Sequence, residues 1–378
     1  MHRTIQRRPS VAATLACVLL AALLGATAHA VHAADAGLEL AMTLVASSPH
    51  APAAPPDLHI ATTWPDACLP SIERVSMLPG HVDITLRATR RNCARTPTPL
   101  ELSVNPARAA GWTNFPASVY EVRLFLQDGE RPAELIGFHW LDANGGSGPV
   151  HPENGFWWPM RADSASSVMS GSSITLERQG DRIAVTLLGY ERGIPTWYFG
   201  SADLLGSTAR MHLMRMLGGA DAFEPPAEAT VAEPGPVLHL HFSSPARAQA
   251  WIERPLHGSA RAIELQSLAL MRLAFVPGRS GEAWRGTWVL VRTDSAEAHL
   301  TTLSTARTSD ADAFRLADDA SGEVLECRYA EPGDDVVPSS CTLSRAGTLL
   351  ALFDRVGLDR FDGRTPDGAV VRLVRIPD

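Results

Sequence analysis

Two histidines that are separated by one residue have a spacing that suits metal chemistry. His239 and His241 lie in the run VLHLHFS, where apolar residues alternate with them. In a β-strand, residues i and i+2 project to the same face, so both imidazoles are available to one ion while the apolar residues face a core. A closed site needs further ligands, for which His212 is the nearest candidate. The alternative is that both histidines occupy the solvent face of an amphipathic strand.

A second group of candidate side chains is aromatic. Flat rings stack on sugars and on peptide or base faces, and the polar tips of Trp and Tyr tolerate partial exposure. The candidates for a binding surface are Trp157, Trp158, Trp197 and Tyr198. The alternative is that these rings pack in a core. In the run TWYFGS, Trp197 and Phe199 project to one face of a strand and Tyr198 to the other, so the three rings do not form one platform.

Sequence motifs of known catalytic sites are absent. The chain lacks G-x-S-x-G, H-E-x-x-H, the P-loop and G-x-G-x-x-G, and its acidic clusters lack the spacing of a calcium loop. We therefore predict no cofactor and favour a non-catalytic protein. The alternative is a hydrolase in which two carboxylates from separate strands converge, as in glycosidases, or in which the histidine pair holds a metal.

The start of the chain predicts export. Residues 1–33 combine a basic segment, an apolar run and alternating small residues, which is the pattern of a signal peptide that is cleaved after Ala30 or Ala33. The remaining sequence has no apolar stretch long enough to span a bilayer, so we expect a periplasmic or secreted protein without a stable membrane span. Its expected partner is a component of the cell envelope, either a glycan or a protein.

The arginine content indicates the kind of source organism, and the net charge excludes some classes of partner. All 33 basic side chains are Arg, which indicates GC-rich codons and a bacterial source. The formal net charge is -8 and becomes more negative when the basic signal segment is removed. An acidic chain disfavours binding to nucleic acid or to anionic membranes.

The cysteines predict disulfides. Of the five cysteines, Cys17 lies in the signal segment, and the other four are Cys68, Cys93, Cys327 and Cys341. An even number in an exported chain favours disulfide bonds, and the absence of a C-x-x-C cluster disfavours a metal site. Three pairings are possible, of which the sequence-local pairs Cys68–Cys93 and Cys327–Cys341 are the simplest.

The composition and the frequent Gly and Pro residues predict an all-β fold. The chain is 45% hydrophobic and contains 29 Gly and 28 Pro, which favours many short strands over long helices. We expect a small antiparallel sandwich and then an antiparallel β-meander or barrel-like domain. The predicted boundaries are a Pro/Ala-rich linker at 34–57, the sandwich at 58–143, a second linker at 144–155, and the antiparallel domain at 156–378 with a loose insertion at 217–236.

Two local predictions concern the antiparallel domain. Residues 173–201 read as a three-stranded meander with turns at Gln179-Gly180-Asp181 and at residues 191–195, where Gly193 can take a positive φ. The run RAIELQSLALMRLAF is partly periodic for a helix, and we favour a pair of strands instead.

Two stretches resemble uncharacterised secreted proteins of Gram-negative bacteria. Trp64-Pro65-Asp66-Ala67-Cys68-Leu69-Pro70 with Cys93 is similar to their N-terminal immunoglobulin-like module, W-P-x-x-C-x-P followed by a second Cys. Gln179-Gly180-Asp181 and the run from Tyr190 to Tyr198 resemble their aromatic meander, Q-G-D followed by Y-x-x-G-x-P-x-W-Y. The resemblance implies an immunoglobulin-like sandwich and supports the Cys68–Cys93 pairing, and it implies no activity.

Overall fold

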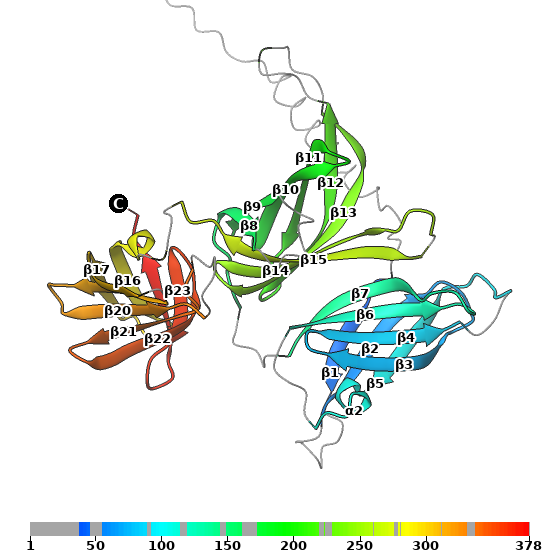
Figure 1. The fold of residues 1–378 in the computed structure, drawn as a ribbon, viewed down its shortest axis with the longest axis horizontal. Coiled ribbons are helices and arrows are strands. Elements are labelled where there is room, and N and C mark those ends of the chain that lie inside the picture. The colour runs from blue at the N-terminus through cyan, green and yellow to red at the C-terminus, as the bar shows by residue number, and fades with distance from the viewer. Residues whose placement is uncertain are drawn as a thin grey trace, which may run out of the picture.

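The computed structural model of the chain is almost entirely β-structure. It describes residues 38–45, 55–88, 92–113, 119–143, 149–160, 172–218, 223, 229–259, 261–275, 279, 281–310, 312–330 and 337–377. The predicted signal peptide lies outside these residues. The strands form an N-terminal pair of sheets, a closed barrel and a nine-stranded sheet, and Figure 1 shows them as three units along the chain. The all-β prediction is confirmed.

The N-terminal unit, called the sandwich below, has two sheets around one core. Its three-stranded sheet has the order β1 (Ala41–Val45), β2 (Asp57–Trp64) and β5 (Thr98–Val104). Its four-stranded sheet has the order β3 (Ser71–Leu78), β4 (His81–Arg87), β6 (Val119–Gln127) and β7 (Glu134–Asp142). Strands β4 and β6 are parallel because the chain between them crosses to the other sheet through β5 and the short helix α2 (Pro106–Ala109). Alternating residues such as Ile60, Ile84 and Val122 fill the core between the sheets.

The predicted linker at residues 34–57 needs a correction. Residues 41–45 form β1, which pairs antiparallel with β2 from Ala41↔Ala61 to Val45↔Asp57. Leu40 is buried in the core of the sandwich, so this segment belongs to the folded unit. The linker interpretation rested on the Pro/Ala-rich run that follows β1, and it did not weigh the short apolar run AMTLV.

The second unit is a closed antiparallel barrel in which each strand pairs with the next along the chain. Its strands are β8 (Gly155–Pro159), β9 (Ser173–Gln179), β10 (Arg182–Glu191), β11 (Ile194–Asp203), β12 (Thr208–Gly218), β13 (Ala229–Ser244), β14 (Arg247–Pro255) and β15 (Ile263–Arg272). Pairing of β15 with β8 closes the barrel. Inward residues alternate along each strand, as Ile183, Val185 and Leu187 do in β10, and they fill the interior.

The meander predicted at residues 173–201 is confirmed as β9, β10 and β11. Its second turn consists of Arg192 and Gly193, both with positive φ (52° and 81°), which is the geometry of a two-residue hairpin turn. The segment around RAIELQSLALMRLAF is a single strand, β15, rather than a helix or a strand pair.

The expected loose insertion at 217–236 also differs from the structure. Residues up to 218 belong to β12, and residues 229–236 belong to β13, so a long hairpin occupies much of the segment. Residues 219–222 and 224–228 lie outside the described residues.

The third unit, called the C-terminal sheet, divides the region that the sequence assigned to one domain. Its strands are β16 (Gly286–Arg292), β17 (Ala298–Leu303), β18 (Thr305–Asp310), β19 (Ala313–Asp318), β20 (Glu323–Arg328), β21 (Ser340–Arg345), β22 (Thr348–Val356), β23 (Arg360–Arg364) and β24 (Val370–Arg375). The sheet curls until β17 meets the end of β19, where the amide of Thr302 donates to Asp318 at 2.9 Å. It has its own core, which includes Trp284, Trp288 and Phe353.

Both predicted disulfides are present. Cys68 is bonded to Cys93 in the sandwich, and Cys327 to Cys341 between β20 and β21. Because Cys327 and Cys341 are fully buried in the core of the C-terminal sheet, their bond joins two neighbouring strands from inside.

We expect the double variant Cys327→Ala/Cys341→Ala to lose about 3 kcal/mol of unfolding free energy, the amount that loop entropy gives for a closed loop of about 15 residues. Urea unfolding followed by circular dichroism measures the loss. A change below about 1 kcal/mol would show that the strand pairing does not depend on the bond.

A buried carboxylate connects the barrel to the C-terminal sheet. Glu153, just before β8, accepts hydrogen bonds from the backbone amides of Leu358, Asp359 and Arg360 at 3.0, 2.8 and 3.0 Å. Gly357 is required beside it because an added Cβ would collide with the carboxylate. Burial raises the pKa of Glu153 to about 7, against the lowering effect of the amides of Asp359 and Leu358.

This raised pKa predicts a pH-dependent stability. A carboxyl whose pKa rises from 4.5 to about 7 on folding contributes stability that is complete below pH 4.5 and is lost as the pH rises through 7. The loss is about 3 kcal/mol for this shift. Urea unfolding between pH 4.5 and pH 8 should therefore show a flatter pH dependence for Glu153→Gln than for the wild type. Equal slopes for the two proteins would contradict the prediction.

Candidate functional site

The aromatic residues that the sequence singled out do not lie together. Trp157 is 1% exposed and packs against Phe242 inside the barrel, so it is core rather than binding surface. Tyr198 also points inward and packs against the barrel core. Trp158 is exposed on β8, and Trp197 is exposed on β11. Strands β9 and β10 separate these two, so the structure does not bring them into one set.

Trp197 instead belongs to an apolar surface on the outer wall of the barrel. Trp197 and Phe199 face outward from β11, with 46% and 38% exposure. The strand register places Leu188 of β10 opposite Trp197, and Met214 of β12 opposite Phe199. Tyr190, on the same face of β10 as Leu188, is 61% exposed. We call this surface the aromatic face and define it by Leu188, Tyr190, Trp197, Phe199 and Met214.

The aromatic face follows from local sequence once the hairpin is known. In β10 the inward residues are Ile183, Val185 and Leu187, so Leu188 and Tyr190 must point out. The tight turn at Arg192–Gly193 then fixes the register of β11. Sequence reasoning identified the two possible faces of TWYFGS. It missed Tyr190, Leu188 and Met214, and the turn together with the alternation in β10 was the signal that could have found them.

A second candidate region is the seam between the sandwich and the barrel. At its centre Trp251, which faces outward from β14, is 1% exposed because the sandwich covers it. Its ring lies 5.5 Å from that of Phe138 in β7. Its indole N–H donates to Glu121 Oε1 in β6 at 2.9 Å. The seam is thus held by an apolar contact and by a hydrogen bond to a carboxylate.

The two histidines of β13 lie in this seam. Leu238, Leu240 and Phe242 face the barrel core as predicted. His239 and His241 face outward, and they are nevertheless buried, with 5% and 4% exposure, because β7 of the sandwich covers them. They are therefore not on a solvent face.

Each histidine has a carboxylate partner rather than a shared ion. His239 Nε2 lies 3.0 Å from Glu253 Oε2, and His241 Nε2 lies 3.1 Å from Asp142 Oδ2. His212 faces outward from β12 near Arg210. Within the described part of the chain, the only group with three ligands in reach of one ion is Asp66, Cys68 and Cys93, and both sulfurs are used by the disulfide. The described residues thus supply no third ligand for the predicted histidine site.

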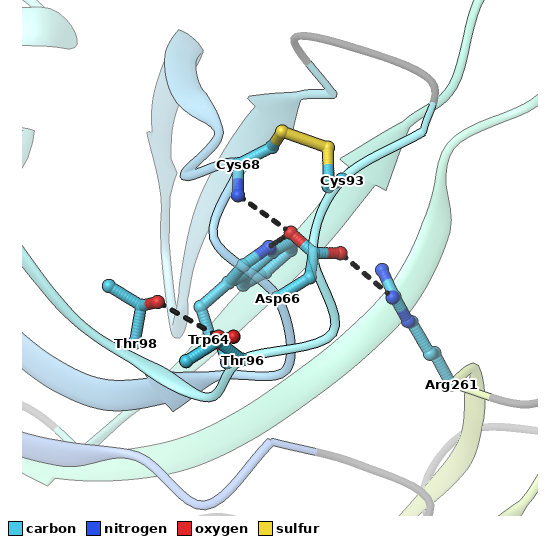
Figure 2. The surroundings of a disulfide bond; sticks show 7 residues. All are labelled: Trp64, Asp66, Cys68, Cys93, Thr96, Thr98 and Arg261. Carbon is cyan, nitrogen blue, oxygen red and sulfur yellow. Dashed lines mark hydrogen bonds and ion pairs between the residues drawn. A yellow bond between two sulfur atoms is a disulfide. The ribbon is translucent and has the colours of Figure 1, made fainter.

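The disulfide loop of the sandwich is the other end of the seam. Asp66 Oδ1 accepts hydrogen bonds from the indole of Trp64 at 3.2 Å and from the amide of Cys68 at 2.9 Å. Its second oxygen lies 3.2 Å from Arg261, which extends from the loop between β14 and β15 of the barrel (Figure 2). Asp66 therefore shapes the loop that precedes the disulfide and also links two units.

Two hollows remain in the seam. The smaller, called the cavity, has a volume of about 230 Å³ and is lined by His139, His239, Glu253 and the segment around Leu38. Burial lowers the pKa of His139, a hydrogen bond to the carbonyl of Trp140 opposes this, and electrostatic interactions with His239 and Arg210 lower the pKa further. The larger, called the cleft, has a volume of about 640 Å³ and lies between Gly80, His81 and Glu121 of the sandwich and the outer wall of β13 to β15.

No protein-family model matches this chain, and the search of curated proteins gives no significant match. No helix in the described parts of the chain is long and apolar enough to cross a membrane.

Proposed function

We propose that this chain is an exported, non-catalytic binding protein that docks a protein of the cell envelope through the aromatic face of its barrel. The observation that carries the proposal is the exposure of Tyr190, Trp197 and Phe199 side by side on the outer wall. Single exposed apolar residues are ordinary on soluble proteins, whereas a contiguous apolar surface marks an interaction site.

The composition of the aromatic face favours a protein partner over a glycan. Leu188 and Met214 complete the surface with aliphatic side chains, each at least 36% exposed. Aromatic residues and Met are enriched in the centres of protein interfaces, where apolar surface is removed from water. A sugar needs hydroxyl partners beside the rings, and this set of five side chains offers a single phenol. The predicted signal peptide and the two disulfides are consistent with a partner in an oxidising compartment.

Hydrolysis has less support from the site geometry. A glycosidase-like mechanism uses two carboxylates around the bond that is cleaved. Among the residues that the structure describes, the cleft is lined by one carboxylate, that of Glu121. In the cavity, Glu253 is engaged by His239, and Glu39 is largely exposed near Arg210.

Photo-crosslinking in intact cells tests the proposal. A photoreactive amino acid at position 197 should give one main crosslinked protein product, and the same group at Leu352, an exposed residue of the C-terminal sheet, should not. Substitution of Phe199 by Ser should remove the product at position 197. Crosslinks to carbohydrate would assign the face to a glycan, and equal products at both positions would contradict a specific interface.

A further inference from the structure

We propose that the cleft between the sandwich and the barrel binds a small, uncharged, hydroxyl-rich ligand with the size and chemistry of a mono- or disaccharide. This site is separate from the aromatic face, which lies on β10 to β12, because it uses the next part of the barrel wall, β13 to β15. Its volume of about 640 Å³ is within the range of known small-molecule sites. The cavity, at about 230 Å³, is below that range and already contains the paired His239 and Glu253.

The sandwich side of the cleft carries a carboxylate that is fixed in place. Glu121 is 12% exposed at its side chain, and one oxygen accepts the N–H of the buried Trp251 at 2.9 Å. Its other oxygen lies 3.1 Å from Nδ1 of His81. A carboxylate oxygen accepts more than one hydrogen bond, so each retains capacity for a ligand hydroxyl. Because the hydrogen bond from Trp251 already orients the group, less side-chain entropy remains to be lost when a ligand binds.

The barrel side of the cleft supplies polar groups at regular positions. The strand register places His241 opposite Gln249 and Ser267 opposite Trp251, so imidazole, amide and hydroxyl groups follow the outer wall. The ring of His241 is oriented by Asp142. Ala269 lies opposite Gln249 in the strand register, and its short side chain leaves space in the cleft. Donors and acceptors that alternate with small apolar positions match a ligand that carries hydroxyls on an apolar ring.

The charge balance of the cleft favours a neutral ligand. Glu121 supplies one negative charge and Arg247 one positive charge. The guanidinium of Arg247 donates to the carbonyl of Val337 in the C-terminal unit, so it also has a structural role. A ligand of either sign would meet one like charge in the cleft, which costs free energy.

Calorimetric titration of the mature full-length protein tests the proposal. The panel is glucose, N-acetylglucosamine, maltose and cellobiose as neutral sugars, glucosamine as a cation and glucuronate as an anion. We expect saturable binding of at least one neutral sugar. Gln249→Ala should weaken it by about tenfold, which corresponds to about 1.4 kcal/mol. Ser267→Phe should abolish binding because the ring fills the cleft, and Ser103→Phe, an exposed serine on the other sheet of the sandwich, should leave it unchanged.

The proposal would be overturned by no saturable binding of any neutral sugar, by binding that survives Ser267→Phe, or by binding of glucosamine or glucuronate alone. Circular dichroism shows whether each variant is folded. If Ser267→Phe does not fold, the expected loss of affinity in Gln249→Ala still tests the site. Trp197→Ser should not affect sugar binding. If it does, the sugar occupies the aromatic face, and both this proposal and the protein partner proposed above are contradicted.

Discussion

Replacement of Trp251 by Ala is expected to lower the unfolding free energy by about 3–5 kcal/mol, the cost of truncating a large buried aromatic residue. Trp251 is 1% exposed and lies in the apolar centre of the seam with Phe138 and Ile263. Its loss also removes the hydrogen bond that the indole N–H donates to Glu121. The largely buried carboxylate then lacks one of its hydrogen-bond donors, which costs further free energy. Because the residue belongs to the interface, we expect the sandwich and the barrel to unfold in separate transitions.

Trp251→Phe separates the two contributions. The phenyl ring retains the apolar contact and removes the hydrogen bond to Glu121, so we expect a loss of about 1–3 kcal/mol. Urea unfolding followed by far-UV circular dichroism, together with limited proteolysis of the loop between the units, measures both variants. A loss below about 1 kcal/mol for Trp251→Ala would mean that the seam contributes little to the stability of the chain.

The double variant Trp197→Ser/Phe199→Ser should reduce the affinity for the envelope partner by about 100-fold or more, since each central aromatic residue of an interface contributes about 2 kcal/mol. Both side chains already face solvent in the free protein, so the unfolding free energy should change little. Titration of the partner, identified by crosslinking and then purified, measures the affinity.

Leu352→Ser is the matched control for this variant. Leu352 is an apolar side chain, 49% exposed, on β22 of the C-terminal sheet. Its substitution should leave the affinity unchanged. Equal effects of the two changes would indicate non-specific adhesion rather than an interface at the aromatic face.

The parts of the fold that depend on local chemistry could be predicted from the sequence. Arg192 and Gly193 form a tight turn because glycine adopts a positive φ without strain, and alternating residues on either side specify the hairpin. The two disulfides join the sequence-local cysteines. The immunoglobulin-like assignment of the sandwich remains a prediction, and the structure adds a parallel pair between β4 and β6.

The candidate sites were less predictable because distant segments determine them. Trp197 and Tyr198 are similarly apolar, so alternation alone did not decide which of them faces water. The inward residues of the neighbouring strand β10, together with the register set by the turn at Arg192–Gly193, decided it. The sequence indicated a solvent face or a metal site for His239 and His241, because nothing near them in the sequence shows that β7 covers them. The division of residues 156–378 into two units likewise depends on which strands pair.

Hydroxyl-radical labelling of the protein in intact cells, compared with the purified protein, tests the central claim most directly. Mass spectrometry reads the oxidation of Tyr190, Trp197 and Leu352 in the same sample. If the aromatic face docks an envelope protein, oxidation of Tyr190 and Trp197 should fall severalfold in cells while that of Leu352 stays the same. Equal labelling of all three residues in cells and in the purified protein would contradict the claim.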